Sequence, residues 1–263
     1  MIGRIRLVLA LMIAAIVTPP LGLYQWVAVR THLIDDRKVP RLYHRILLKL
    51  LGIRVRVTGE IAAARPLMIA SNHISWTDIM VLGSLAELHF IARSDMASWP
   101  GIGTLARLQR SVFVERDQRR ESAGQARAIA DRLVGGDPMV LFPEGTTGTG
   151  NRIQPFKSTL FAAAAMARAA GGHETIAIQP VAIAYTRLQG MPMGRLHRAH
   201  AAWVGDQTLV PHLAALLGEG AMDVEVHFGE AILFGPGSDR KKTAREIEAR
   251  VSAMMAQALR RPL

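Results

Sequence analysis

The chain contains no cysteine, and this absence excludes several kinds of site at once. There can be no disulfide, no thiolate nucleophile and no cysteine-based zinc site. The sequence also lacks a Gly-x-Ser-x-Gly segment, so a nucleophilic serine of the α/β-hydrolase kind is not supported. His197 and His200 are three residues apart but have no third ligand beside them, so we expect no metal site.

Nucleotide-binding motifs are missing as well. Residues 101–106 match the dinucleotide-binding pattern superficially, but no predicted strand precedes them, and the pattern depends on that context. The glycine-rich residues 142–150 lack the Lys-Ser/Thr pair of a phosphate-binding P-loop. We therefore expect the protein to work without a cofactor.

Aromatic residues and acidic residues are both scarce. Aromatics make up 5% of the chain, and no segment interleaves them with basic residues, as proteins that bind single-stranded nucleic acid do. Acidic residues are outnumbered 21 to 32 by Lys and Arg, which gives a formal net charge of +11. This excess favours an anionic partner. We expect that partner to be membrane lipid or a phosphorylated substrate, and we expect no nucleic acid.

Near the N-terminus, residues 7–29 contain no charged side chain. A membrane-spanning helix needs roughly 20 apolar residues, so this run is long enough to cross a bilayer. Pro19 and Pro20 predict a break near its middle, because proline lacks the backbone N–H that a helix uses. No small-x-small cleavage site follows, so a cleaved signal peptide is not indicated. Basic residues flank both ends and leave open whether the segment crosses the membrane or enters and returns on one face.

Residues 40–51 place apolar side chains on one side of a predicted helix and Arg41, Arg45 and Lys49 on the other. Such a basic amphipathic helix favours the surface of a membrane. The alternative is an ordinary surface helix packed on the domain that follows. We assign residues 1–52 to an N-terminal membrane-associating helical segment, a membrane anchor that is partly apolar and partly amphipathic.

Residues 53–263 are predicted to form a single α/β domain. Short apolar or alternating segments, which predict strands, are separated by segments with helical spacing. That order predicts a mixed, partly parallel sheet flanked by helices. The expected strands cover residues 54–58, 66–71, 89–92, 111–115, 139–142, 175–185, 201–204 and 222–228, and the expected helices cover residues 79–88, 118–134, 157–170 and 239–261.

The stretch at residues 72–78, Asn-His-Ile-Ser-Trp-Thr-Asp, lies between a predicted buried strand and a predicted helix. If His73 lies just before the helix, Asp78 can reach back to one imidazole nitrogen and leave the other facing a cleft. The pair is then an oriented general base. The alternative is structural: Ser75 and Asp78 also match a capping box, with Ser75 as the N-cap residue and Asp78 near the N3 position. Both roles can hold together if they use different carboxylate oxygens.

A second polar stretch, Phe-Pro-Glu-Gly-Thr-Thr-Gly-Thr-Gly at residues 142–150, follows another predicted strand. Its backbone N–H groups and hydroxyls can hold a phosphate or another polar headgroup. Glycine and proline alone would equally favour a plain surface turn. The functional interpretation gains from its position, because ligands tend to bind at the carboxyl ends of strands in α/β sheets.

Four ordered motifs resemble those of the glycerolipid acyltransferase family, in particular the 1-acylglycerol-3-phosphate O-acyltransferases. They are Asn-His-x4-Asp at 72–78, Val-Phe-Val-Glu-Arg at 112–116, Phe-Pro-Glu-Gly-Thr at 142–146 and Gln-Pro-Val at 179–181. The resemblance covers roughly residues 40–235. It implies an enzyme on the cytosolic face of the cytoplasmic membrane that transfers a fatty acyl group from a thioester to a hydroxyl.

The resemblance also implies roles for individual residues. His73 is the catalytic base and Asp78 orients it, while Arg116 meets the anionic group of the acceptor. Arg93 stands where the family often has lysine, so its contact with the acyl donor is in doubt. The implied substrate-binding residues are Arg116, Glu144, Gly145, Thr146 and Arg93.

Three functions follow from this resemblance. The first expectation is transfer from acyl-CoA or acyl-carrier protein to 1-acylglycerol-3-phosphate, a lysophospholipid, giving phosphatidic acid. The alternative acceptor is a lyso-ornithine lipid, because residues 194–212 resemble bacterial lyso-ornithine-lipid acyltransferases. A non-catalytic lipid-binding protein with the same fold is disfavoured by the intact His73 and Asp78 pair.

Overall fold

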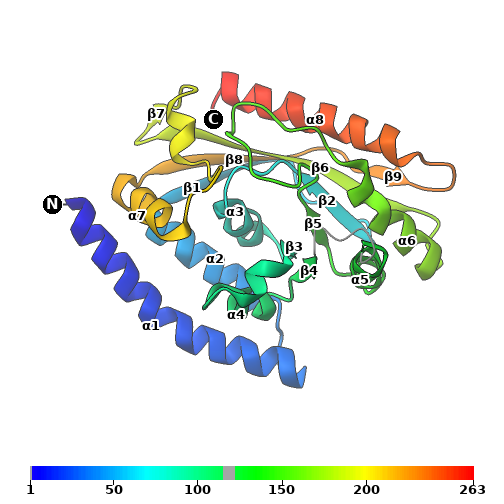
Figure 1. The fold of residues 1–263 in the computed structure, drawn as a ribbon, viewed down its shortest axis with the longest axis horizontal. Helices are drawn as coiled ribbons and strands as arrows, with labels where there is room; N and C mark the ends of the chain where they lie inside the picture. Colours follow the sequence, from blue (N-terminus) through cyan, green and yellow to red (C-terminus); the bar gives the residue numbers. More distant parts are fainter. Residues whose placement is uncertain (1, 115–121) are drawn as a thin grey trace.

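The computed structural model describes residues 2–114 and 122–263, and Figure 1 shows a sheet with helices on both faces. In chain order the helices and strands are α1 (Ile2–Thr31), α2 (Lys38–Leu51), β1 (Ile53–Thr58), β2 (Leu67–Ser71), α3 (Thr77–Leu85), β3 (His89–Arg93), η1 (Ser94–Ser98), α4 (Ile102–Leu108), β4 (Val112–Val114), α5 (Ser122–Val134), β5 (Met139–Leu141), η2 (Ser158–Phe161), α6 (Ala162–Gly171), β6 (Ile176–Leu188), β7 (Met191–Pro192), η3 (His197–His200), α7 (Leu209–Glu219), β8 (Met222–Phe228), β9 (Ile232–Phe234) and α8 (Arg240–Arg260).

The sheet is mixed, as the sequence predicted. Its main path runs β1-β8-β6-β2-β5-β3-β4, with β7 and β9 pairing with β6. β2 is parallel to both β5 and β6, whereas β6 is antiparallel to β8 and β9. One hydrophobic core lies under α2, α3 and α7, and the other lies under α5, α6 and α8. Two apolar faces on one sheet explain why β2 and β5 are buried at every position.

The first helix differs from the prediction, because α1 continues through Pro19 and Pro20 without a break. Figure 1 shows it as one curved helix lying along α2, α4 and α7, which it contacts. Proline removes backbone hydrogen bonds from a helix, but packing of α1 against three other helices offsets that loss. α1 is also apolar and long enough to cross a membrane over Ile5–Thr31, by length and composition.

Two polar side chains hold α1 against the rest of the protein. Gln25 is buried, and its Nε2 donates to the backbone oxygens of Asp36 and Leu108 at 2.7 and 3.0 Å. Near the other end, the Arg6 guanidinium occupies the space beside Gly52 and Gly220, where a Cβ on either glycine would overlap it. These glycines are the C-cap residues of α2 and α7. A cation at the carboxyl ends of two helices is favourably placed, because both helix dipoles are negative there.

α2 turns its apolar side toward the domain. Leu48 and Leu51 are buried, and the helix packs on α3 and β1. On its basic side, Arg41 and Arg45 each donate from Nε to the backbone oxygen of Ser84. Most of the apolar side of α2 is therefore packed on the domain, as the second interpretation of this segment expects. The boundary at residues 52 and 53 stays a prediction.

Several other elements depart from the sequence prediction. The predicted strand at 201–204 is wrong: Ala201 and Ala202 are buried in a turn and coil segment that joins no sheet. α4, α7 and β9 were not predicted as elements. α4 packs against α1, α7 packs against α1 and α2, and β9 pairs with β6. These contacts join distant parts of the chain, so the local pattern of apolar residues does not reveal them.

Candidate active site

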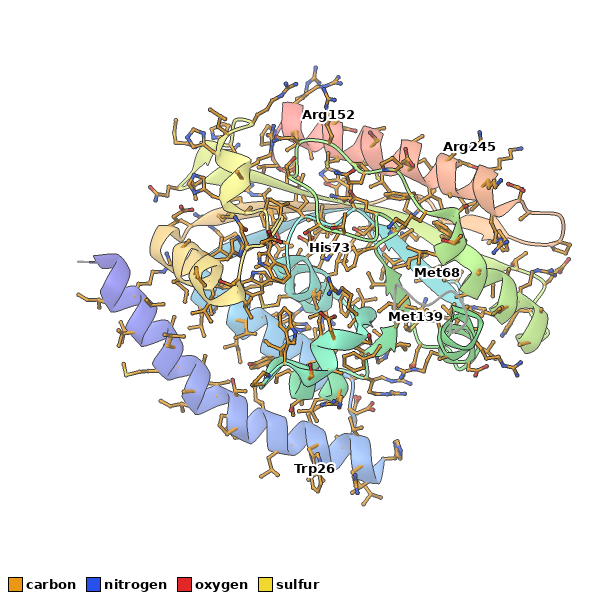
Figure 2. All side chains as sticks on the ribbon, in the orientation of Figure 1. Trp26, Met68, His73, Met139, Arg152 and Arg245 are labelled. Carbon is orange, nitrogen blue, oxygen red and sulfur yellow. The ribbon has the colours of Figure 1, made fainter. Side chains whose placement is uncertain are left out.

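The register of two parallel strands brings the two polar stretches together. Ala70 of β2 pairs with Leu141 of β5, so the loops that follow both strands leave the sheet at the same edge. His73 comes from the first loop, and residues 142–150 form the second. Figure 2 shows His73 beside α3, inside the body of the protein.

His73 and Asp78 form the predicted pair. The His73 Nδ1 lies 2.9 Å from the Asp78 Oδ2, and the Asp78 side chain is fully buried while 14% of the His73 side chain is exposed. A carboxylate accepts hydrogen bonds, so Nδ1 carries the proton in this contact. The Nε2 atom is then left as a proton acceptor.

Asp78 also serves the turn before α3, where it makes one half of the predicted capping box by accepting from the Ser75 backbone N–H. Its Oδ2 accepts from the backbone N–H groups of Ile74 and Ser75 at 2.6 and 2.9 Å. The other half of the capping box is absent, because the buried Ser75 hydroxyl has no hydrogen-bond partner, and α3 begins after Trp76. The expectation that the two roles use different oxygens is wrong, because Oδ2 makes all of these contacts. One oxygen can accept them because Ile74 and Ser75 directly follow His73.

The other oxygen of Asp78 is held from across the sheet. The hydroxyl of Tyr185, in β6, donates to Asp78 Oδ1 at 2.8 Å. The hydroxyl of Thr77 lies 2.6 Å from that of Tyr185. The sequence analysis missed Tyr185, because it lies in a segment that was predicted only as a strand, with no polar motif around it. No local signal could have linked it to a residue 107 positions earlier.

Three residues of the second loop contact His73. The Phe142 ring stacks on the imidazole with 4.0 Å between centroids and 14° between planes. Glu144 Oε1 accepts from the His73 backbone N–H at 2.7 Å, and the Gly148 N–H donates to the His73 backbone oxygen at 2.8 Å. These contacts fix the main chain of His73 as well as its ring.

Glu144 is turned inward. It is buried, and its Oε2 accepts from the backbone N–H of Gln154 at 2.7 Å. Burial raises the pKa of Glu144 to about 7, although the N–H groups of Gln154 and His73 act in the opposite direction. Glu144 thus links the backbone of His73 to the backbone of Gln154. Its expected contact with the acceptor stays a prediction.

The other predicted binding residues are dispersed. Thr146 is exposed, and Gly145 has a φ of 72° and lies under Lys157, whose Nζ would be 2.8 Å from a Cβ at that position. Arg93 ends β3 on the surface, where its guanidinium donates twice to Asp95, at 2.9 and 2.7 Å. Arg116 lies outside the described residues. Lys157, which the sequence analysis did not single out, brings a cation onto the loop.

An apolar cavity of about 310 Å³ lies between α1 and the domain. Its walls come from α1, α2, α3, α4 and α7, and they include Trp76, Trp99 and Trp203. Trp76 follows His73 by three residues, and its Nε1 donates to His212 Nδ1 at 2.9 Å. A residue of the turn that follows His73 therefore lines the cavity. Its lining suits a hydrocarbon chain.

No group of three His, Cys, Asp or Glu residues that could hold a metal occurs in the part of the chain that the structure describes. His197 stacks on His200, which contacts Glu219 through Nδ1 at 2.6 Å. What the site does offer is an oriented imidazole beside an apolar cavity. Such a site can accept a proton from a hydroxyl on an amphiphilic molecule.

Comparisons with known proteins agree with this class. Residues 53–184 match the family model described as Acyltransferase. The chain is 47% identical over 261 residues to the lyso-ornithine lipid O-acyltransferase of Brucella abortus (strain 2308), covering 98% of this chain and 97% of that protein. It is 35% identical over 132 residues to the 1-acyl-sn-glycerol-3-phosphate acyltransferase of Neisseria meningitidis serogroup B, covering 49% of this chain and 51% of that protein.

The fold has a counterpart among solved structures. The crystal structure of the 1-acyl-sn-glycerophosphate (LPA) acyltransferase PlsC from Thermotoga maritima superposes with a TM-score of 0.66 at 21% identity, covering 98% of both chains. The chain belongs to the acyltransferase family, and it is an enzyme of acyl transfer. The family and the fold that the sequence motifs predicted are confirmed.

Proposed function

We propose that this protein is a lyso-ornithine lipid O-acyltransferase, which moves a fatty acyl group to the free hydroxyl of a lyso-ornithine lipid. The observation that carries the proposal is the 47% identity to a protein of that name over nearly the whole of both chains. The sequence analysis put 1-acylglycerol-3-phosphate first and this acceptor second. The full-length relative favours the second.

One region near the site gives this choice a structural basis. Residues 194–212, which resemble lyso-ornithine-lipid acyltransferases in sequence, lie against the loop that holds His73. Asn151 donates from Nδ2 to the Arg195 backbone oxygen at 3.1 Å and accepts at Oδ1 from Arg198 Nε at 2.7 Å. Trp203 donates its backbone N–H to Ile74 at 2.9 Å. A segment that carries the resemblance to lyso-ornithine-lipid acyltransferases thus contacts the turn that follows His73.

The chemistry needs only this chain's residues and two substrates. The acceptor hydroxyl attacks the thioester carbonyl of acyl-CoA or acyl-carrier protein while His73 Nε2 takes its proton. Asp78 stabilises the imidazolium that forms. When the tetrahedral intermediate collapses, the C–S bond breaks and the thiolate takes the proton from His73, leaving an ester and a free thiol. No metal or cofactor enters this scheme, and the protein binds no nucleic acid.

The membrane supplies the acceptor in this proposal. The outer face of α1 exposes large apolar side chains, and Figure 2 shows Trp26 pointing away from the domain. A helix of this kind places the cavity next to lipid, where an acyl chain can enter it. Because the thioester donors are cytosolic, we place the domain on the cytosolic face of the cytoplasmic membrane.

A second candidate is 1-acylglycerol-3-phosphate. It is favoured by the four ordered motifs and by the 35% identity to the Neisseria meningitidis protein over about half of the chain. That match covers a smaller share of both proteins than the match to the Brucella abortus protein.

The test is kcat/KM for both acceptors with each donor, in the wild type and in Arg195→Ala. We expect turnover of lyso-ornithine lipid to exceed that of 1-acylglycerol-3-phosphate, and Arg195→Ala to lower only the former, because a lyso-ornithine lipid carries a carboxylate that an exposed arginine can bind. Arg127→Ala, which removes an exposed arginine paired with Asp131 on α5, is the matched control. Turnover of 1-acylglycerol-3-phosphate alone would replace the proposed acceptor and leave the family assignment intact.

A further inference from the structure

Behind the His73 and Asp78 pair stands a chain of two hydroxyl groups. Tyr185 has a single hydroxyl proton, and it donates that proton to Asp78 Oδ1 at 2.8 Å. The contact of 2.6 Å between the hydroxyls of Tyr185 and Thr77 must therefore use the proton of Thr77. The order of donation is Thr77 to Tyr185 to Asp78. Hydrogen bonds in such a series strengthen one another.

The chain is sealed from solvent. Tyr185 and Thr77 are each 1% exposed, and Asp78 is 0% exposed. Burial and the nearby Asp78 carboxylate raise the pKa of Tyr185 well above its usual range, so the phenol keeps its proton. No other donor to Asp78 Oδ1 is found among the described residues, whereas Oδ2 accepts from His73, Ile74 and Ser75. Tyr185 is the partner of the oxygen that faces away from the base.

We propose that Tyr185, supported by Thr77, is a positioning residue of the acyltransferase, which sets both the orientation and the effective charge of Asp78 behind His73. Its hydrogen bond fixes the plane of the carboxylate, so that Oδ2 faces the imidazole. The same bond draws negative charge toward Oδ1 and moderates the pull of Asp78 on the imidazolium. The inference rests on the proposed role of His73 as the base.

A purely structural role for Tyr185 makes different predictions. Its ring is one of the largest fully buried side chains of the core, so any change at this position affects packing. Packing, however, involves the ring, whereas the proposed role involves the hydroxyl alone. Tyr185→Phe keeps the ring and removes one oxygen, which separates the two roles.

The experiment is the pH dependence of kcat/KM for Tyr185→Phe in the full-length protein, with kcat and KM measured separately. We expect kcat to fall roughly tenfold, because a hydrogen bond to a charged group is lost, with KM unchanged. We expect the acid limb of kcat/KM to move to higher pH by about half a unit or more. Asp78 without its second donor carries more charge on Oδ2 and holds the imidazolium more strongly.

A second set of variants, made in a Glu144→Gln background, distinguishes the effect of Tyr185 from that of other titratable groups near the pair. Glu144 lies in the loop after β5, and besides burial the negative charges of Asp78 and of Glu248 in α8 both raise its pKa. Since Glu144 titrates near neutral pH, it can contribute to the acid limb of the wild type. The same shift should therefore appear between Glu144→Gln and the double variant Glu144→Gln, Tyr185→Phe. A shift confined to the wild-type background would assign the acid limb to Glu144 and overturn the inference.

Tyr43→Phe is the control for the loss of a tyrosine hydroxyl, because the Tyr43 hydroxyl also contacts a threonine, Thr18, at 2.9 Å. Both residues line the apolar cavity, so only the midpoint of the acid limb is compared, and not KM. Tyr43→Phe should leave that midpoint in place. Thr77→Val should move that midpoint in the same direction as Tyr185→Phe by a smaller amount, and it provides the test if Tyr185→Phe does not fold. An unchanged acid limb in both variants, with or without a lower melting temperature, refutes the positioning role. His73→Ala tests the mechanism separately: if it retains activity, the base assignment fails before Tyr185 is considered.

Discussion

At the scale of single residues, His73 is fixed by groups from its own turn and from the loop after β5. Asp78 and Phe142 hold its ring, and Glu144 and Gly148 hold its backbone. A general base must keep its accepting nitrogen aimed at the substrate, and each of these contacts removes one way in which the imidazole could turn. The two polar stretches found in the sequence therefore form a single site around His73.

Replacing the base should remove acyl transfer without unfolding the protein. His73→Ala deletes the proton acceptor, so we expect activity to fall by about two to four orders of magnitude. Binding to lipid vesicles and the melting temperature should stay near those of the wild type. Activity within tenfold of the wild type would exclude His73 as the base.

Asp78→Asn should affect both activity and stability. Its Oδ2 accepts from His73 and also from two backbone N–H groups, so an amide nitrogen at that position would leave donors facing one another. We expect lower kcat and a lower melting temperature together, measured by acceptor turnover and thermal unfolding. Retained activity with a lower melting temperature would mean that Asp78 serves only the turn before α3.

Glu144 gives the folded protein a pH dependence of its own. The pKa of Glu144 is about 7 in the folded protein and 4.5 in its ordinary state, so the folded state binds the proton more tightly. The stability that this group contributes is complete below pH 4.5 and is lost as the pH rises through 7. The upper limit of the change is about 3 kcal/mol.

Glu144→Gln should therefore remove part of the decline in stability between those pH values. The measurement is the free energy of unfolding of wild type and variant across the range. Glu246→Gln is the control, because Glu246 is exposed and pairs with Arg250 at 2.8 Å on the surface of α8. If the wild type and Glu144→Gln show parallel curves, the carboxyl does not titrate in this window.

At the scale of elements, α1 has two different sides. One side carries Gln25 and Ala28, which are buried against the domain, and the other exposes Ile16 and Leu23 at 71% and 64%. A helix that only packed on the domain would not keep such side chains in water. We infer that the exposed side contacts lipid while the buried side closes the apolar cavity.

Polar substitutions on that exposed side should weaken membrane binding alone. Ile16→Asn with Leu23→Asn removes apolar area from the lipid contact and leaves the packed side unchanged, so the melting temperature should stay constant. Flotation with vesicles is the measurement. Leu233→Asn is the matched control, because Leu233 is 61% exposed on β9, a strand that pairs with β6 and that Figure 1 shows away from α1. An equal loss of vesicle binding in the control would mean that the exposed side of α1 is not the specific site of lipid contact.

At the scale of the whole molecule, the charge of +11 adds a second attraction to an anionic membrane. Deleting residues 1–30 should weaken vesicle binding without abolishing it, because the basic surface of the domain remains. That residual binding should fall as salt is raised from low values, since exposed charges are screened within about 10 Å at 0.1 M. A truncated protein that ignores anionic vesicles at low salt would assign all of the membrane binding to α1.

The sequence alone determined much of this protein. The absence of cysteine, the uncharged residues 7–29, the spacing of His73 and Asp78, and the alternation of strands with helices are local properties. They sufficed for the mixed sheet, the His73 and Asp78 pair and an apolar helix long enough to cross a membrane, because periodicity and short spacings fix what one turn or one strand can do. The family came from the resemblance of four ordered motifs. The break predicted at Pro19 and Pro20 is wrong because that prediction used local propensity alone, whereas α1 is held by packing against other helices.

Only the tertiary structure decided how the site is supported. Tyr185 meets Asp78 because β6 lies next to β2 in the sheet, and Glu144 turns inward because the loop after β5 closes over His73. Strand order and register set these contacts, and they join residues 71 to 107 positions apart. No local pattern in the chain encodes such a separation. The His73 and Asp78 pair was therefore visible in the sequence, whereas the contacts of Tyr185 and Glu144 with it became visible only when the sheet had placed them beside it.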